Sequence, residues 1–282
     1  MAPVALPRLT VALTVDHDAI SDSVRRGDPP VKLSHGEFGP RVGAPRILEL
    51  LASRGISSTW FVPGHTIETF PESIEAILAG GHELASHGWF HEDFATLSTD
   101  ETRTILADSF AQIERVSGSP PAGWRAPYWS LDARTLQLVE EAGFVYDSSL
   151  MSDDYRLSRI RHRDVHSVKA GTHWGPEGRL FEVPVYWALD DWPHFEPSVD
   201  AGRDGLAAPS KVLEIWTEEL RWAWEHARGG LLTVTVHPEC IGRGHRMAML
   251  ERFIDAASAL DGVVFERLDR YVARFAAATP GE

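Results

Sequence analysis

Segments of two kinds alternate along this chain, and the alternation limits the fold more than any other feature. Short runs rich in β-branched and apolar residues, such as Leu9 to Val15 and Leu231 to Val236, are separated by longer runs with the spacing of amphipathic helices. The two kinds alternate about seven times, which is typical of parallel sheets whose helices return the chain to the start of the next strand. We therefore predict a parallel α/β fold, either doubly wound or closed into a barrel.

The bounds of these segments follow from caps, glycines and prolines. A capping box, Ser98-Thr99-Asp100-Glu101, marks the start of a helix. Gly143 marks the end of the helix expected over 131–142. We expect strands at 9–15, 57–62, 82–86, 123–127, 144–146, 181–185, 231–236 and 263–265, and helices at 45–55, 71–79, 99–117, 131–142, 210–228, 246–260 and 268–278. Residues 20–43, 151–179 and 187–209 show no period and are expected to be irregular, the first as a long loop over the mouth of the fold.

Polar residues follow the expected strands at their carboxyl ends. They are Asp16, Asp18, His87, Arg125, Asp147 and His237. Parallel barrels gather their active residues at that face, because the strand ends converge there. The position of these residues therefore predicts an active site at the carboxyl end of the sheet.

His87 and His91 are candidate metal ligands. Their spacing places both imidazoles on one side of a helical turn, and a catalytic zinc site needs about three protein ligands and an open position. In an extended backbone Asp16 and Asp18 share a face, with His17 opposite, so Asp18 is the expected third ligand and Asp16 the general base. The alternatives are two solvated histidines and an Asp-rich turn or helix cap.

Two further residues have expected catalytic roles. His237 is positioned to give a proton to a leaving nitrogen, and Arg125 to pair with Asp16 and hold it ionised and oriented. The alternatives are a core histidine bonded to backbone and a surface salt bridge. For Asp147, a turn or cap role and a site role both stay open.

Composition narrows the class of protein. With 282 residues, 43% of them hydrophobic, the chain is long enough for one large domain, residues 1–282. Its net charge of −14 disfavours nucleic acid and anionic membranes as partners. Cys240 alone excludes an internal disulfide and is expected to be a small buried residue. The start shows no export signal, and no run approaches membrane-spanning length, so we expect a cytoplasmic protein. We also expect the chain to assemble as a homo-oligomer.

Taken in order, the motifs resemble those of the polysaccharide deacetylase superfamily, carbohydrate esterase family 4. They are Thr14-Val15-Asp16-His17-Asp18, Ser86-His87-Gly88-Trp89-Phe90-His91, Arg125-Ala126-Pro127-Tyr128, Tyr146-Asp147-Ser148-Ser149 and Val236-His237-Pro238. The resemblance implies a distorted (β/α) barrel of about seven parallel strands, similar to a TIM barrel. It also implies one divalent ion, expected to be zinc, held by Asp18, His87 and His91, with Asp16 as base, His237 as acid and Arg125 behind the base.

The chain departs from the family pattern at its first motif. Most members carry adjacent aspartates, whereas His17 separates the pair here and stays open as a ligand in place of Asp18. This departure, with residues 39–43, 190–193 and 241–246, resembles an intracellular branch that includes peptidoglycan-deacetylase-like proteins, cyclic imide hydrolases and cofactor-independent allantoinases.

The substrate is expected to be a non-peptide amide, and the first hypothesis is an N-acetylated sugar or glycan. The candidate substrate-binding residues are Trp89, Tyr128, Trp129, Asp190, Arg243 and His245, while Trp187 and Trp192 are further aromatics near the mouth; all the aromatics could instead be packing residues. The second hypothesis is a small cyclic imide or ureide, with Arg243 and His245 holding its oxygens or merely starting a helix. A third is a binding protein that kept the fold and lost turnover.

Overall fold

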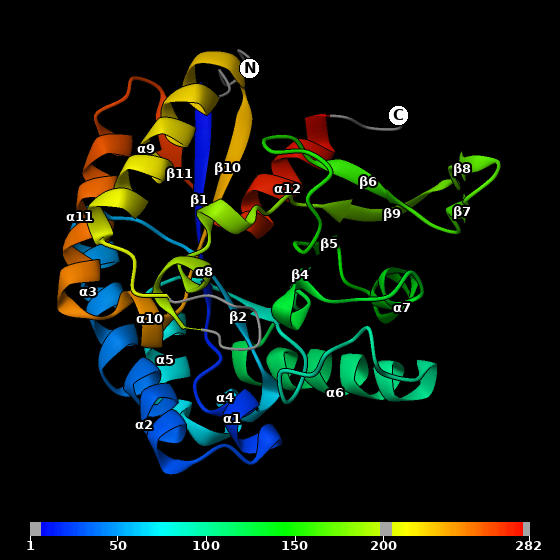
Figure 1. Cartoon of the computed structure of the whole chain (residues 1–282), viewed down its shortest axis with the longest axis horizontal. Coiled ribbons are helices and arrows are strands. Elements are labelled where there is room, and N and C mark those ends of the chain that lie inside the picture. Colours follow the sequence, from blue (N-terminus) through cyan, green and yellow to red (C-terminus); the bar gives the residue numbers. More distant parts are fainter. Residues whose placement is uncertain (1–6, 198–204, 279–282) are drawn as a thin grey trace.

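The architecture is seen in a computed structural model of the chain, which describes residues 7–197 and 205–278. A curled sheet lies at its centre, with the strand order β10-β1-β2-β3-β4-β5-β9-β6 (Figure 1). The strands are β1 (Leu9–Asp16), β2 (Thr59–Val62), β3 (Glu83–Ser86), β4 (Gly123–Trp124), β5 (Tyr146–Asp147), β6 (Ser158–Arg161), β9 (Glu177–Glu182) and β10 (Gly230–Val236).

The strands from β10 to β9 along this order all pair in parallel, so about seven parallel strands form the sheet, as predicted. β6 adds to β9 in the antiparallel sense, and β11 (Val263–Phe265) pairs with the first part of β1. Between β6 and β10 the described residues contribute a single parallel bridge, Asp190 to Thr235. The fold is thus a distorted (β/α) barrel that is incompletely closed on this side.

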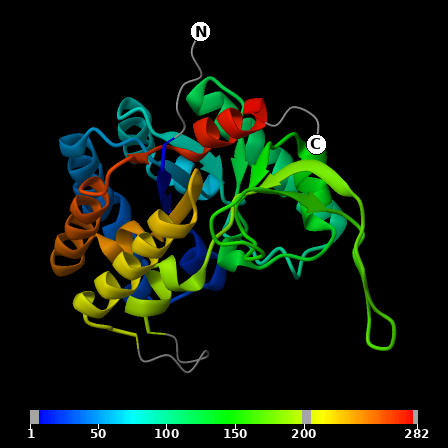
Figure 2. The ribbon, with the colours of Figure 1, turned by 90° about the horizontal axis from the view of Figure 1, so that it is seen from above.

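Helices lie outside the curled sheet (Figure 2). They include α3 (Ala44–Arg54), α4 (Gly64–Thr69), α5 (Pro71–Ala79), α6 (Thr99–Ser117), α7 (Thr135–Ala142), α9 (Pro209–His226), α10 (Pro238–Ile241), α11 (Gly244–Ser258) and α12 (Leu268–Ala278). The predicted capping box is present at Ser98 and Glu101. α7 begins four residues later than predicted, because the Asp132 carboxylate accepts from the Arg134 and Thr135 amides and makes a turn there. α9 begins at Pro209, one residue before the predicted start, with Ala208 as its N-cap.

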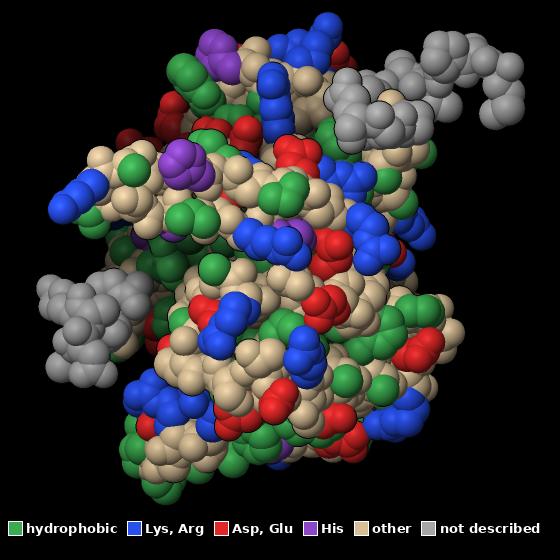
Figure 3. Space-filling model, turned by 90° about the vertical axis from the view of Figure 1, so that its right-hand side faces the viewer, with side chains coloured by type: hydrophobic (Ala, Val, Ile, Leu, Met, Phe, Trp, Pro, Cys, Tyr) green, Lys and Arg blue, Asp and Glu red, His purple; other side chains and the backbone are tan. Residues whose placement is uncertain are grey.

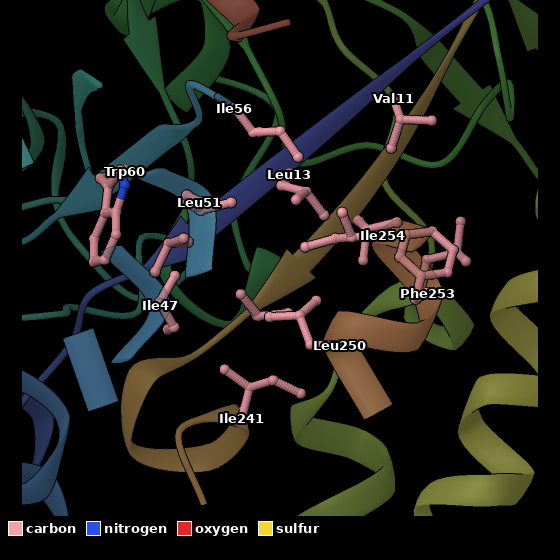
Figure 4. Close-up of a cluster of buried hydrophobic side chains, with 14 of the residues drawn as sticks. Val11, Leu13, Ile47, Leu51, Ile56, Trp60, Ile241, Leu250, Phe253 and Ile254 are labelled. Atoms are coloured by element: carbon pink, nitrogen blue, oxygen red, sulfur yellow. The ribbon is translucent and has the colours of Figure 1, made fainter. Parts of the chain in front are cut away.

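The largest part of the core lies between the sheet and α3 and α11. Val11 and Leu13 of β1 face Ile47 and Leu51 of α3 and a group of side chains from α11 (Figure 4). β1 is buried along its whole length, which explains why it reads as an apolar run without alternation. Burial of each such side chain contributes roughly 1.5–3 kcal/mol, so this core fixes the position of the strand that carries Asp16.

Residues 20–43 are helical, and the prediction of a loop was wrong. They form α1 (Ser21–Arg26), α2 (Pro30–Phe38) and the π-helical turn η1 (Gly39–Gly43). Gly36 lies so close to Ala19, and Gly43 so close to Pro238, that an added Cβ would approach their backbone oxygens to 2.3 and 2.0 Å. Close glycine contacts hold these helices, which an apolar periodicity does not reveal.

The prediction of an irregular segment over 151–179 was also wrong, because this segment contains β6, the first half of β9 and a hairpin of β7 (Val165–Ser167) and β8 (Gly171–His173). The hairpin extends away from the barrel (Figures 1 and 2). Every residue of β7 and β8 is exposed, so no buried face produces an alternating pattern. β9 correspondingly starts before the predicted strand and ends at Glu182.

The segment 187–209 contains the short helices η3 (Trp187–Leu189) and α8 (Trp192–Phe195), and its residues 198–204 lie outside the described part.

On the face that carries the hairpin, basic and acidic side chains are interspersed (Figure 3). Within residues 7–197 and 205–278, no helix combines the length and apolar character needed to cross a bilayer. Cys240 is buried, as expected.

Candidate active site

The carboxyl end of β1 lies at the centre of the polar cluster. Asp16 is the last residue of β1, and Asp18 follows on the same face. His17 points the other way, where its Nε2 is 3.0 Å from Ser73 Oγ and its ring packs edge-on against Trp60. Burial lowers the pKa of His17 to about 4. The structure thus brings Asp18, and not His17, towards the histidine pair.

His87 follows β3 directly, and His91 follows a tight turn. The helical turn expected here was wrong, because Gly88 and His91 have positive φ angles of 71° and 56°. The Glu92 carboxylate accepts from the Trp89 and Phe90 amides at 3.0 and 2.8 Å and holds this turn. The left-handed residues turn the chain back, so that both rings still face Asp18.

Asp18, His87 and His91 form a buried group whose ligand atoms all lie within 4.8 Å of one another. Asp18 Oδ1 is 3.5 Å from His87 Nε2, and Asp18 Oδ2 is 3.2 Å from His91 Nε2. Asp18 Oδ1 is buried without a hydrogen-bond partner in the described residues. His87 Nδ1 lies 2.8 Å from the Arg125 carbonyl oxygen and donates to it, which leaves the Nε2 lone pair facing Asp18. This donor set fits a divalent cation such as zinc.

The pKa shifts describe the charges of this group. Burial lowers the pKa of His87 to about 4 despite the opposing effect of Asp16 and Asp18, so the ring is neutral, as a ligand must be. Burial alone would raise the pKa of Asp18, but His91 and His87 outweigh it and lower that pKa. For His91, burial is outweighed by Asp18, and its pKa is raised.

Arg125 follows β4 and is fully buried beneath the site. Its Nη1 donates to Asp16 Oδ1 at 2.6 Å and to Thr14 Oγ1 at 3.0 Å. Its Nε and Nη2 donate to the carbonyl oxygen and the hydroxyl of Ser148, both at 2.9 Å. The guanidinium also lies 4.0 Å from the centre of the Phe61 ring. Arg125 therefore holds one oxygen of Asp16 and leaves the other facing the site.

His237 follows β10, and Asp191 is its partner, a residue that the sequence analysis did not single out. His237 Nδ1 is 2.7 Å from Asp191 Oδ1, and Asp190 Oδ1 is 3.7 Å from the same nitrogen. Its Nε2 is 4.0 Å from Asp16 Oδ2 and 3.9 Å from Asp18 Oδ2. The adjacent acids before Trp192-Pro193 were the available signal.

The charge of His237 follows from this arrangement. Burial lowers its pKa, but Asp190 and Asp191 outweigh burial and raise the pKa well above the ordinary value. Asp190, Asp191 and His237 also have the donor types of a metal site. Because His237 Nδ1 already bonds Asp191, we interpret His237 and Asp191 as a proton donor and its partner instead.

The candidate substrate-binding residues fall into two sets. Tyr128 lies against the His91 ring, with centroids 4.3 Å apart, and Trp129 packs against Trp187, with centroids 4.4 Å apart and ring planes inclined by 39°. Asp190 lies beside His237. The others lie further out: Trp89 covers Gly64, Arg243 packs on Phe38 and reaches His35, and His245 is exposed at the start of α11.

Tyr128 is also the point where α1 meets the site. Its hydroxyl donates to the Asp22 carboxylate, and Arg25 Nη2 donates to the same hydroxyl at 2.9 Å. Tyr128 and Trp129 both have positive φ angles, 58° and 52°. Such backbone strain persists where the surroundings hold it, and it clusters at functional sites.

Comparisons with known proteins agree with this geometry. The polysaccharide deacetylase family model matches residues 9–146. A peptidoglycan deacetylase of Helicobacter pylori is 31% identical over 270 residues, which cover 90% of this chain and 92% of that protein. A peptidoglycan deacetylase-like protein of Gibberella zeae is also 31% identical, over 88% of this chain and 80% of that protein.

Solved structures show the same relationship. A Mycobacterium smegmatis protein described as a polysaccharide deacetylase superposes with a TM-score of 0.83 and 35% identity, over 100% of this chain and 96% of that one. An allantoinase superposes with a TM-score of 0.82 at 21% identity, over 98% and 93%, which shows a shared fold. With near full-length relatives and the expected barrel, the chain belongs to the polysaccharide deacetylase family.

Proposed function

We propose that this chain is a metal-dependent hydrolase of a non-peptide carbon–nitrogen bond that removes the acetyl group from an N-acetylated sugar. The family supports hydrolysis of such a bond by deacetylation. The observation that carries the proposal is the convergence of Asp18, His87 and His91 into one buried donor set beside Asp16. These three residues would hold one divalent ion, with zinc the expected metal.

A divalent ion held by these residues would act as a Lewis acid on the amide carbonyl and would lower the pKa of a water molecule bound to it. Asp16 is the base that takes the proton from the attacking water, because Arg125 orients it and leaves Oδ2 facing the site. His237, whose pKa is raised by Asp190 and Asp191, gives a proton to the departing amine nitrogen, and Asp191 fixes its ring. Arg125 positions the base without touching the substrate.

The aromatic side chains at the mouth support a sugar as substrate. Tyr128 and Trp187 are 39% and 44% exposed, and Trp129, in the same turn as Tyr128, packs against Trp187. Exposed aromatic faces bind the apolar faces of sugar rings, and here they follow the rim from His91 towards Asp190. We assign Tyr128, Trp129 and Trp187 to sugar binding. Trp89, Arg243 and His245 remain substrate-binding predictions without such a contact.

A substrate panel tests the proposal. Zinc-loaded protein is incubated with N-acetylglucosamine oligomers, peptidoglycan fragments, succinimide and allantoin, and acetate release and ring opening are measured. We expect acetate from the acetamido sugars. Ring opening of succinimide or allantoin, without acetate from any sugar, would favour the cyclic imide or ureide hypothesis.

A matched pair of variants tests the aromatic residues. Trp187→Ala is expected to raise KM for a sugar oligomer several-fold with little change in kcat, because it removes a contact made equally before and during reaction. Trp222 is also exposed but lies on α9, stacked on His226, so Trp222→Ala is the control and should leave both constants unchanged. Equal effects of the two variants would refute the assignment.

Assembly as a homo-oligomer, a cytoplasmic location and a single domain over residues 1–282 stay predictions.

A further inference from the structure

Two buried carboxyl groups behind the site have no role in the mechanism above. Asp147 ends β5 and Glu182 ends β9, and the two residues pair across the parallel ladder. Both are at most 1% exposed, and Ser149 donates its hydroxyl to one carboxyl group and its amide to the other, so the two groups lie side by side. Two ionised carboxylates have acceptors only, so a bond between them needs a proton.

The hydrogen bonds around the pair show where that proton lies. Asp147 Oδ1 accepts from Ser149 Oγ at 2.7 Å, and Glu182 Oε1 accepts from the amides of Ser149 and Leu150 at 3.2 and 2.8 Å. Asp147 Oδ2 and Glu182 Oε2 are buried and receive no donor from the described residues. One proton between these two oxygens satisfies both. Burial raises the pKa of Asp147, and burial together with Asp147 raises that of Glu182.

The pair is connected to a metal-ligand candidate through two serines. Because the Ser149 hydroxyl donates to Asp147, its lone pair is free to accept from the Ala126 amide, at 2.9 Å. Ser148 holds the Arg125 guanidinium by its carbonyl and hydroxyl oxygens. Residues 125 and 126 are thereby fixed on both sides of the carbonyl that accepts from His87 Nδ1 at 2.8 Å.

We propose that Asp147 and Glu182 share one proton in the folded protein, and that this acid pair positions the Arg125–Ala126 peptide and, through it, His87. Both are positioning residues, since they act through Ser149 and touch no reacting group. The link to His87 rests on the metal site proposed above, whereas the shared proton does not, so the two parts are measured separately.

Charged and titratable groups face the pair from β4 and from the segment around β6. Arg125 faces Asp147 from the end of β4. A hollow of about 220 Å³ along β6 is lined by Glu182 together with Arg159, Arg161, Arg163, Asp164 and His166. Above the ordinary carboxyl pKa, the folded protein therefore keeps one proton that the unfolded chain has lost. Stability from this proton is present at low pH and decreases as pH rises.

Denaturant unfolding of the metal-free protein between pH 5 and 8 tests the shared proton. Glu182→Gln keeps a donor to Asp147 but has no titrating proton. The unfolding equilibrium constant of the wild type should rise with pH more steeply than that of this variant, by about tenfold per pH unit. Equal pH dependence in the two proteins would refute proton sharing.

Zinc affinity, measured by competition with a chelator at pH 7, tests the positioning role. Glu182→Gln should bind zinc like the wild type, and Glu182→Leu should bind roughly 10- to 100-fold more weakly, the range for groups that orient a ligand. The control is Glu83→Gln, a buried carboxyl at the opposite end of the sheet, which should leave zinc affinity unchanged.

The outcomes separate the two claims. A folded Glu182→Leu protein with wild-type zinc affinity would refute positioning. If the wild type binds no zinc, the metal site proposed above fails together with positioning, and the unfolding measurements still decide on the shared proton. Circular dichroism of each variant shows whether it is folded.

Discussion

The two ends of the barrel both contain buried polar clusters, and they differ in how completely these are paired. At the amino end of β3, Glu83 Oε2 accepts from Thr59 Oγ1 and the Asp269 amide at 2.6 and 3.0 Å, and Oε1 accepts from the Tyr146 hydroxyl at 2.9 Å. At the carboxyl end, Asp18 Oδ1 and His91 Nδ1 have no partner among the described residues. The paired Glu83 stabilises the fold, whereas the unpaired oxygen of Asp18 lies where the proposed metal ion would bind.

The energetic costs of unpaired groups and of strained backbone also distinguish the two ends. An unpaired buried polar group costs about 1–3 kcal/mol, and a strained backbone residue costs a similar amount. Ala19, His91, Tyr128 and Trp129 all have positive φ and lie around the carboxyl end. The protein thus concentrates unfavourable local structure at the end of the sheet opposite to Glu83, whose two carboxylate oxygens are both paired. The variants below test this contrast, from the largest expected effect to the smallest.

His87→Ala should abolish both metal binding and activity. It removes one of three donors and the group that the Arg125 carbonyl orients. Metal content after dialysis and acetate release measure the two losses. A His87→Ala protein that retains stoichiometric metal would show that the unpaired atoms do not mark the ligand set.

Asp16→Asn should keep the metal and lose activity. The amide keeps an acceptor for Arg125 at 2.6 Å but cannot take a proton from water, so kcat should fall by roughly 10²- to 10⁴-fold. Metal analysis and steady-state kinetics separate the two properties. Turnover near the wild-type rate would count against Asp16 as the base.

Asp191→Asn should change the pH dependence of activity. For His237, burial opposes the charged form, and the two neighbouring aspartates outweigh it, so removing one charge lowers the pKa of His237. The acid then loses its proton at lower pH, and the alkaline side of the kcat profile should move to lower pH. The stabilisation that the proton provides is present below the ordinary histidine pKa and is lost as pH rises through the raised one.

The kcat profile is compared between wild type and the Asp191→Asn variant at saturating substrate. At neutral pH we expect a loss of roughly 10- to 100-fold, typical of groups that orient a catalytic histidine. An alkaline side at the wild-type pH would argue that His237 is not the proton donor.

Glu83→Gln should affect stability alone. In the wild type both Glu83 oxygens accept hydrogen bonds, from Thr59, Tyr146 and Asp269. The NH₂ group of glutamine cannot accept, so at least one of these donors loses its partner, and the free energy of unfolding should fall by about 1–3 kcal/mol. Burial and Asp269 raise the pKa of Glu83 to about 7, so wild-type stability should decline with pH more than that of the variant. Denaturant unfolding and kcat at pH 7 are the measurements. A large drop in kcat would break the contrast between the two ends.

Local patterns predicted a parallel α/β sheet and the residues at its strand ends, whereas the choice of a barrel came from the family resemblance. A fully buried strand such as β1 is visible as an apolar run, and residues at the ends of parallel strands share one face. The helices over 20–43 were missed because close contacts of two glycines with Ala19 and Pro238 hold them in place. Such contacts leave no apolar periodicity in the sequence, and Pro238 is far from these helices along the chain. The His87-to-His91 turn depends on left-handed residues that spacing alone does not specify.

Partners from distant segments were the hardest to foresee. Asp191 meets His237 and Glu182 meets Asp147 only because η3 and β9 lie next to the strands that carry the motifs. A sequence shows which groups are ionisable, but the pairing that decides their roles is a property of the fold.

The central claim is that Asp18, His87 and His91 hold one divalent ion. Anomalous scattering at the zinc edge, from crystals of zinc-loaded protein, tests it directly. We predict a single peak bonded to one oxygen of Asp18 and to Nε2 of both histidines. A peak bonded to Asp190, Asp191 and His237 instead, or no peak at the three predicted ligands, would contradict the account.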